Sequence, residues 1–252
     1  TVRRAGAPCA SPSPRPPPAE GPGRRGPPAG AVHAVDPRPH ATRRAFSVLA
    51  ENPETLPTPY QGGNTILASD HGAMPDLTAR YTWKGTWGTF GLSAIARQYR
   101  TRRALTNDTD SGGAIAGGGR WIINSNNDLR YQLSYGEGLG RYLGLGNGSD
   151  VEIDMDGNIQ TVSTIADWVA WRHDYTAKLR TTIMNSRVNY DHDIGNTGGL
   201  ASKSQQSIRA HVFYSPLPQG DVGAELMYGR REAESGDSGD ISRLQFTTKY
   251  RF

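Results

Sequence analysis

Basic side chains recur at alternate positions of several short segments, between residues that are mostly apolar. In residues 129–135, for example, Arg130 and Gln132 alternate with leucine and tyrosine. Arginine suits bidentate contact with carboxylates and phosphates, and lysine adds a compact positive charge. Gathered on one side of a sheet, such groups create a positive potential that concentrates anions. The candidate anion-contacting residues are Arg80, Arg97, Arg130, Lys178, Arg180, Arg209, Lys249 and Arg251.

Metal and cofactor motifs are weak. Residues 154–158 read Asp-Met-Asp-Gly-Asn, like the opening of a calcium loop, but the later bidentate glutamate is absent, which favours a solvated loop. Asp191, His192 and Asp193 would alternate between the two faces of a strand and so rarely converge on a metal. No Lys-Ser/Thr pair follows the glycines at 117–119, so they are not a phosphate loop. We expect no metal and no cofactor.

A nucleophilic site is not predicted either. His211 is the one histidine with a clear strand assignment, and Ser207 lies four residues away on the same face. Four residues along a strand span roughly 13 Å, which is too far for a hydrogen bond. We therefore expect no catalytic residues and no enzyme activity.

Period-two alternation of apolar and polar residues continues through most of the chain from Phe46 onward. This pattern predicts strands with two different faces. The clear strands, at about residues 77–83, 90–97, 129–135, 179–183, 208–214, 222–229 and 244–252, are joined by less cleanly patterned ones near 46–50, 113–123 and 160–172. The sequence therefore predicts about ten strands.

Short and long connections alternate between these strands. Short turns are expected at 84–86, 124–127, 173–174 and 215–220, and longer polar loops at 100–111, 136–157, 191–203 and 231–240. Up-and-down membrane barrels have short turns at one end and long loops at the other. Tyrosines and tryptophans at strand ends fit the aromatic girdles of such barrels.

Composition agrees with an antiparallel β-structure. Hydrophobic residues are 35% of the 252, with 31 glycines, 11 tyrosines and 5 tryptophans. No run approaches the roughly 18 apolar residues that a membrane-spanning helix needs. A barrel strand needs only one apolar face, so low hydropathy is compatible with a membrane barrel. A soluble β-sandwich is the rival fold, and Cys9, the sole cysteine, excludes an intrachain disulfide.

The first 44 residues differ from the rest and hold 11 of the 17 prolines. Such a segment buries too little apolar surface to offset its ordering entropy, so we predict a disordered tail at 1–44 and a barrel region at 45–252. Residues 1–50 hold eight arginines and two acidic residues. Of the 28 basic and 24 acidic residues of the whole chain, 20 and 22 therefore fall in 51–252. The positive charge belongs to the tail, and nucleic-acid binding is not expected.

The last segment resembles the terminal strand of Gram-negative outer-membrane proteins, in which alternating aromatics end in a carboxy-terminal phenylalanine. Phe246, Tyr250 and Phe252 carry this likeness. The resemblance implies recognition by the barrel assembly machinery.

Several segments, in order, resemble more narrowly the DcaP-like family of trimeric porins. They are Phe-Ser-Val at 46–48, Glu-Asn-Pro-Glu-Thr at 51–55, Met-Pro-Asp-Leu-Thr-Ala-Arg-Tyr at 74–81, Ala-Ile-Ala-Arg-Gln at 94–98, Tyr-Gly-Glu-Gly-Leu-Gly-Arg-Tyr at 135–142 and Met-Tyr-Gly-Arg-Arg-Glu at 227–232. The likeness covers about residues 46–252.

This resemblance implies a sixteen-stranded, homotrimeric barrel in outer-membrane lipid that passes small, preferably anionic, hydrophilic solutes. The expected fold is therefore an all-β antiparallel transmembrane barrel, of which this chain supplies about ten strands. Because the family's first strands are missing, we expect an open edge whose unpaired amides cannot lie in lipid. A structural or adhesive barrel without a conducting pore is the alternative function.

Overall fold

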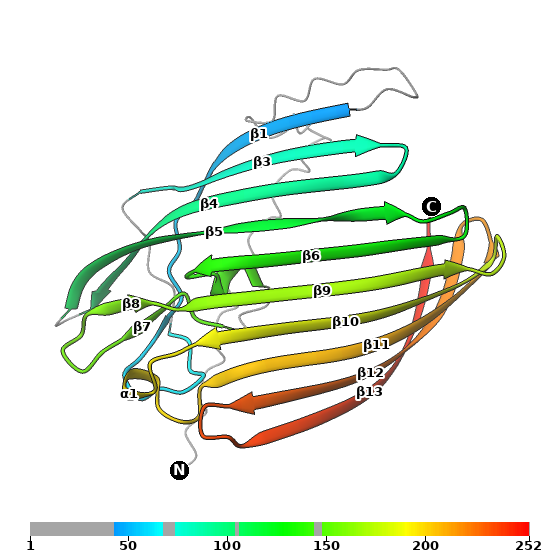
Figure 1. Cartoon of the computed structure of the whole chain (residues 1–252). Coiled ribbons are helices and arrows are strands. Elements are labelled where there is room, and N and C mark those ends of the chain that lie inside the picture. The colour runs from blue at the N-terminus through cyan, green and yellow to red at the C-terminus, as the bar shows by residue number, and fades with distance from the viewer. Residues whose placement is uncertain (1–42, 68–73, 104–105, 144–147, 252) are drawn as a thin grey trace, which may run out of the picture. The chain divides into compact units, whose positions relative to one another are not determined.

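Ten antiparallel strands form one large sheet in a computed structural model of the chain, which describes residues 43–67, 74–103, 106–143 and 148–251 (Figure 1). Each strand pairs with the next along the chain, so the sheet is an up-and-down meander. The strands are β1 (Arg43–Glu51), β3 (Asp76–Gly85), β4 (Gly88–Arg103), β5 (Thr106–Ile122), β6 (Asn127–Glu137), β9 (Ser163–Asp174), β10 (Leu179–Asp191), β11 (Ser202–Leu217), β12 (Gly220–Ala233) and β13 (Ser238–Tyr250). The all-β fold and the ten strands expected from alternation are confirmed.

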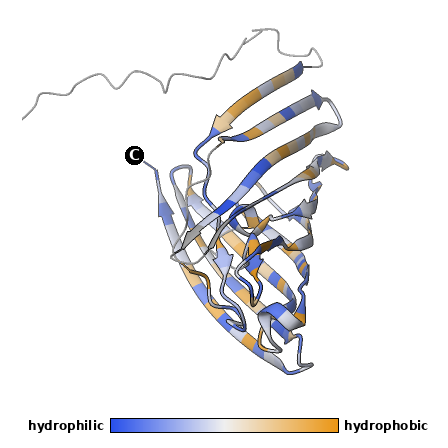
Figure 2. Ribbon diagram, turned by 90° about the vertical axis from the view of Figure 1, so that its left-hand side faces the viewer, coloured by the Kyte–Doolittle hydropathy of each residue, from blue (hydrophilic) through white to orange (hydrophobic). Residues whose placement is uncertain are grey.

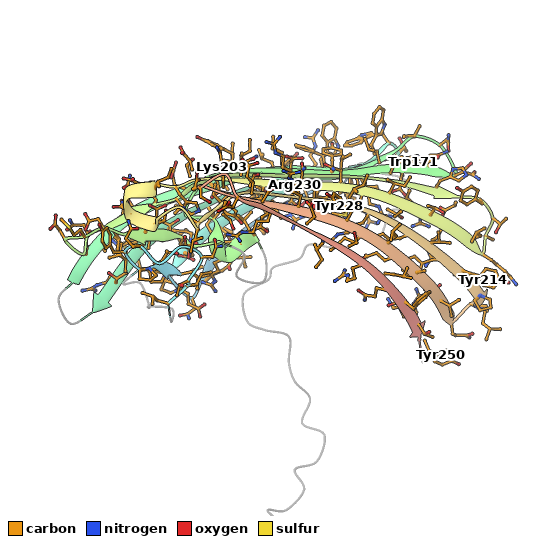
Figure 3. The ribbon with its side chains drawn as sticks, turned by 90° about the horizontal axis from the view of Figure 1, so that it is seen from below. Trp171, Lys203, Tyr214, Tyr228, Arg230 and Tyr250 are labelled. Atoms are coloured by element: carbon orange, nitrogen blue, oxygen red, sulfur yellow. The ribbon has the colours of Figure 1, made fainter. Side chains whose placement is uncertain are left out.

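The alternation sorts side chains onto two different faces of this sheet, as the hydropathy colours show (Figure 2). The apolar positions share one face because the register keeps them opposite one another, as in the pairs Leu133 with Gly117 and Leu226 with Leu244. These side chains are exposed: Leu133 is 52% accessible and Leu226 60%. The sheet curves with this outward face on its convex side (Figure 3). A contiguous apolar surface of this extent is rare on soluble monomers and is typical of sheets that face lipid.

Short turns and long connections lie at opposite ends of the strands, as expected. Two predicted loops are nevertheless shorter than the sequence indicated. Residues 100–111, expected to form a loop, extend β4 and β5 into a long hairpin, and most of 231–240 belongs to β12 and β13. Both segments are polar on their two faces, so they lack the alternation by which the sequence reveals a strand.

A smaller assembly lies on the concave side of the sheet at the long-loop end (Figures 1 and 3). It contains a second sheet of β2 (Pro57–Thr58), β7 (Val151–Ile153) and β8 (Ile159–Thr161), with the helical turns η1 (Gly140–Leu143) and α1 (Ile194–Thr197). Tyr99 of β4, Val151, Ile153 and Ile159 form its buried core. Both helical segments in the described ranges are four residues long, which is too short to cross a bilayer.

The large sheet is open within the described residues, because β1 and β13 each pair on one side only. This agrees with the expected open edge. The predicted tail at 1–44 lies almost entirely outside the described residues, which begin with β1.

Candidate functional site

A row of basic side chains crosses the concave face of the large sheet. Backbone pairing continues from Lys84 through Thr89, Arg120, Arg130, Ala170, Met184, Arg209 and Met227 to Arg243. Five of these nine residues are cationic, and Lys84 and Arg120 were not among the sequence candidates. In the sequence, Lys84 and Arg120 are each recognisable as a cation within an alternating segment. Only the strand register shows that they align with the other cations of the row. We call this set the basic row.

Carboxylates of the neighbouring concave row neutralise part of the basic row. Asp128 binds Arg120 at 2.8 Å and Arg130 at 2.7 Å, and Glu225 binds Arg243 at 2.6 Å. Lys84 and Arg209 form no ion pair within the described part of the chain. The Nε atom of Arg209 is buried without a hydrogen-bond partner. Arg209 therefore has no direct ion-pair partner in the described residues, although the Glu225 carboxylate interacts with it electrostatically.

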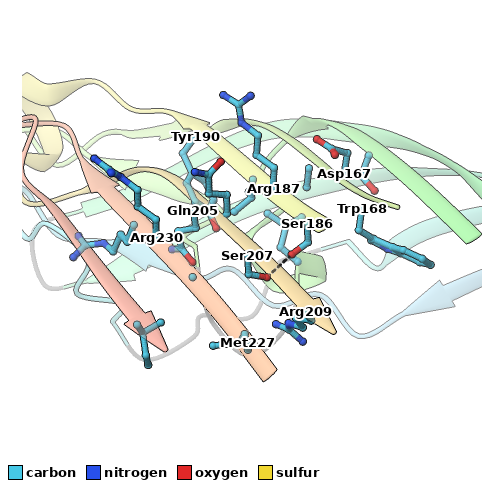
Figure 4. A pocket seen from close by; sticks show the side chains of 18 of the residues that line it. Asp167, Trp168, Ser186, Arg187, Tyr190, Gln205, Ser207, Arg209, Met227 and Arg230 are labelled. Carbon is cyan, nitrogen blue, oxygen red and sulfur yellow. Dashed lines mark hydrogen bonds between the residues drawn. The ribbon is translucent and has the colours of Figure 1, made fainter. Parts of the chain in front are cut away.

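Arg209 borders a hollow of about 770 Å³ on this face (Figure 4). Trp168, Tyr190 and Gln205 also border it, and the Ser186 and Ser207 hydroxyls are hydrogen-bonded at 2.8 Å at its centre. The lining combines polar groups with aromatic and apolar surface. A lining of this mixed kind is typical of a surface that contacts small polar or hydrated solutes and not of a packed protein core.

Arg80 is another cation of this face without an ion pair in the described ranges, and it is exposed. Its guanidinium extends over the neighbouring strand, where a Cβ added to Gly91 would lie 3.5 Å from Nη2. It also lines a cavity of about 370 Å³ with Leu49, Ile95 and Tyr142. Arg80 therefore presents charge to solvent.

Arg97 lies on the same face of its strand but is enclosed. Its Nε donates to Asp76 at 3.0 Å, and Nη1 donates to Asp150 at 2.8 Å and to the Gly138 carbonyl at 2.6 Å. The Tyr99 and Tyr142 rings have centroids 4.9 and 5.1 Å from Cζ. We call these side chains the Arg97 clamp. The sequence expectation of a solute-facing Arg97 needs correction, because its side chain is only 1% accessible and two carboxylates match its charge.

The Arg97 clamp connects the loops to the large sheet. Asp150 also accepts from the backbone amides of Leu56, at 2.9 Å, and Arg141, at 3.1 Å, so one carboxylate joins three segments. Burial raises the pKa of the Asp150 carboxyl, and the Arg97 guanidinium opposes that shift. Burial also raises the pKa of Tyr142, beside the carboxylates of Asp76 and Glu51, so this phenol stays a neutral donor.

The remaining sequence candidates gather at the short-turn end. Asp221 binds both Arg180, at 3.3 Å, and Arg251, at 3.2 Å, whereas Lys249 has no ion pair in the described residues. Lys178 belongs to the turn before β10 and donates to the Pro216 carbonyl at 3.4 Å, so its expected place on a strand wall is wrong. Turn residues have no fixed alternation, which is why the sequence misplaced it.

The outward face carries the terminal aromatics. Phe246 is 75% exposed and Tyr250 59%, both on the convex side, and Phe252 lies outside the described residues. Near the turns, Trp83 and Trp87 meet edge to face at 5.5 Å. The His173 ring lies tilted against Trp171, at 5.7 Å, and edge to face against Tyr175, at 4.4 Å. Aromatic rings at one level of an apolar face are typical of a membrane–water boundary.

The minor motifs have structural partners. Asp154 accepts from the Asn158 backbone amide at 2.8 Å in a tight turn, His192 lies 2.7 Å from Glu152, and no group of three metal-ligating side chains occurs in the described ranges. Ser207 is hydrogen-bonded to Ser186, and His211 Nε2 lies 3.1 Å from a Glu225 carboxylate oxygen without forming a hydrogen bond.

The outer membrane channel DcaP of Acinetobacter baumannii has a similar structure. The TM-score is 0.70 at 20% identity, over 86% of this chain and 60% of that chain. The chain has the fold of an outer-membrane channel. It spans 60% of the length of that protein, in keeping with the open sheet. No family model matches, and no curated protein matches.

Proposed function

We propose that this chain is part of a Gram-negative outer-membrane porin, of the DcaP-like type and trimeric, that lets small hydrophilic solutes diffuse passively and prefers anions. It needs no cofactor and catalyses no reaction. The carrying observation is the division of one sheet into an exposed apolar convex face and a polar concave face, on which several cations have no direct ion pair in the described residues. A positive potential on a water-filled wall concentrates anions and repels cations.

Arg80 and Arg209 carry the anion preference in this proposal. Both lie on the concave face and have no ion pair in the described residues, whereas Arg130 shares Asp128 with Arg120, and Arg180 shares Asp221 with Arg251. Arg97 holds the loops and contributes little field, because its carboxylate partners cancel its charge at close range.

The test is the reversal potential of the detergent-refolded chain in a planar bilayer under a salt gradient. Once strands that pair with β1 and β13 close the barrel, we expect stepwise conductance with anion preference, which Arg80→Gln and Arg209→Gln reduce. Arg44→Gln removes the same charge from the outward face and should leave selectivity unchanged. Cation preference in the unmodified chain would overturn the anion assignment and keep the pore.

A structural barrel without conduction is the second candidate, and the Arg97 clamp favours it because the clamp holds a packed loop core on the concave side. Absence of current would support this reading only if supplying strands that pair with β1 and β13 also failed to produce conductance. Recovery of current with those strands would instead show that the open sheet had failed to close.

A further inference from the structure

A second polar row crosses the outward face of the large sheet. Pairing continues from Asp167 to Arg187, Gln206, Arg230 and Asp240, on five consecutive strands. By strand alternation the side chains of this row lie on the convex side, opposite Ser186, Ser207 and Arg209, although the same five residues also border the hollow beside Arg209. We call it the outward row.

The outward row marks the loop-side limit of the apolar surface on β9 to β13. Four residues closer to the turns on each strand, the corresponding row of outward residues is wholly apolar. It consists of Trp171, Ile183, Ala210, Leu226 and Leu244. Near the turns, the outward positions of the same strands carry Leu179, Tyr214, Val222 and Tyr250, with no arginine or lysine. The outward cations of these strands therefore gather at one rim only.

Both arginines have spare hydrogen-bonding capacity. Arg187 donates from Nε to Asn189 at 3.2 Å, and Arg230 donates from Nη2 to Ser238 at 3.0 Å. Each is exposed, and neither forms an ion pair in the described ranges. Asp240 is hydrogen-bonded to the Tyr228 hydroxyl. Most of each guanidinium remains available to a ligand.

The spacing favours an anion at the centre of the row. Neighbouring strands are about 4.8 Å apart, so Arg187 and Arg230 each lie about 5 Å from the Gln206 position, and the two aspartates lie about 10 Å from it. Arginine side chains can lean inward over the Gln206 amide, which adds a neutral donor. An anion at the centre would thus meet two guanidinium groups before either carboxylate.

We propose that Arg187 and Arg230 bind the phosphate of a lipid headgroup whose acyl chains lie along the apolar surface beside Leu226. The two arginines and two aspartates of the outward row give it zero net charge, so a free anion would gain little binding energy there. A lipid is held in place by its chains, and its phosphate lies at the level where the apolar surface ends. This inference rests on the proposed membrane location and not on conduction.

The experiment measures lipid retention by native mass spectrometry on the full chain in mixed micelles. The two probes are a diphosphorylated lipid A and the same lipid without phosphates. We expect about tenfold higher retention of the phosphorylated lipid, in line with roughly 1 kcal/mol for each basic residue near a charged headgroup, reduced by the flanking aspartates. The Arg187→Gln/Arg230→Gln double variant should lose this preference, and Arg44→Gln should keep it.

Equal retention of the two lipids by the unmodified chain would overturn the proposal, as would an unchanged preference in the double variant. Displacement of the lipid by millimolar inorganic phosphate would show a site for free phosphate and so overturn the lipid assignment. Because the double variant alters exposed residues only, circular dichroism should confirm its unchanged β-sheet content. The single variants Arg187→Gln and Arg230→Gln, each with a partial loss, provide an independent check.

Discussion

Arg97 and Arg209 lie on the same face of one sheet and have opposite surroundings. Arg97 is surrounded by two carboxylates, two carbonyls and two aromatic rings, whereas the buried Nε of Arg209 has no partner. The difference comes from the loops, which cover the concave face only at the end where Arg97 lies. A charged side chain on the concave face is thus structural where loop residues cover it, and it faces solutes where they do not.

Removing the Arg97 guanidinium should therefore loosen the loops. Arg97→Met leaves Asp150 buried without its cation and leaves Asp76 with Arg141 alone, at 3.6 Å, and breaking a buried pair in this way costs about 3–5 kcal/mol. We expect a lower unfolding midpoint and faster proteolytic cleavage within residues 138–162. Arg243→Met removes an exposed pair and should cost about 0–1 kcal/mol. Equal effects of the two variants would show that the clamp does not hold the loops.

For single residues, the sequence predicted the face of the sheet on which a side chain lies better than it predicted the groups that the side chain contacts. Alternation placed Arg80, Arg130 and Arg209 together on the polar face, and the structure agrees. It could not reveal the enclosure of Arg97, because its partners are distant in sequence: Asp76, the first residue of β3, is 21 residues away, and Asp150, in a connection without periodicity, is 53 residues away. Whether these residues select anions stays a prediction.

The glycines of β5 govern how closely it approaches its neighbours. Gly117 and Gly119 both face outward, but a Cβ at Gly119 would overlap the Thr89 carbonyl oxygen, whereas one at Gly117 would lie 3.9 Å from Leu92 Cδ1. We expect Gly119→Ala to cost about 1–3 kcal/mol through overpacking. Gly117→Ala should be neutral or stabilise by about 0.5–1 kcal/mol. Guanidinium unfolding in detergent measures both, and equal midpoints would contradict the close approach.

The apolar surface crosses the strands obliquely, as tilted strands in a bilayer require. On β3 and β4 it includes Leu77 and Ala96 near the loops, whereas on β12 and β13 it lies near the turns and includes Val222 and Phe246. The sequence predicted each alternating segment but not this offset, because offset is a property of the register. The long hairpin of β4 and β5 extends beyond this surface, which explains why it is polar on both faces.

A charge placed inside the apolar surface should cost more than one placed beyond it. Leu226→Arg puts a cation in the wholly apolar row and should destabilise the protein by about 2–4 kcal/mol in lipid, whereas Ser111→Arg on the polar hairpin should cost about 0–1 kcal/mol. Folding yields in vesicles, followed by band shift on unheated gels, compare the two. Equal yields would show that the convex face does not meet lipid.

At the scale of the molecule, the ten strands leave two rows of backbone groups unpaired within the described residues, on β1 and on β13. Such groups are too costly in hydrocarbon to remain free, so a membrane form must pair them with further strands. The strand count was readable from the sequence. The two edge strands were identified only by the strand order in the structure, because alternation within one strand does not identify its neighbours.

The field of the closed molecule leads to the last prediction. If unpaired cations such as Arg80 and Arg209 act through space on a water-filled lumen, salt must screen them, because the Debye length falls from about 10 Å at 0.1 M to about 3 Å at 1 M. The anion-to-cation permeability ratio should therefore fall toward one as salt concentration rises through this range at a fixed gradient. Removing Arg209 should lower the ratio at 0.1 M and barely change it at 1 M. A ratio that stays constant with salt would mean that anions are chosen by direct contact in the hollow beside Arg209, where screening by bulk ions has little effect.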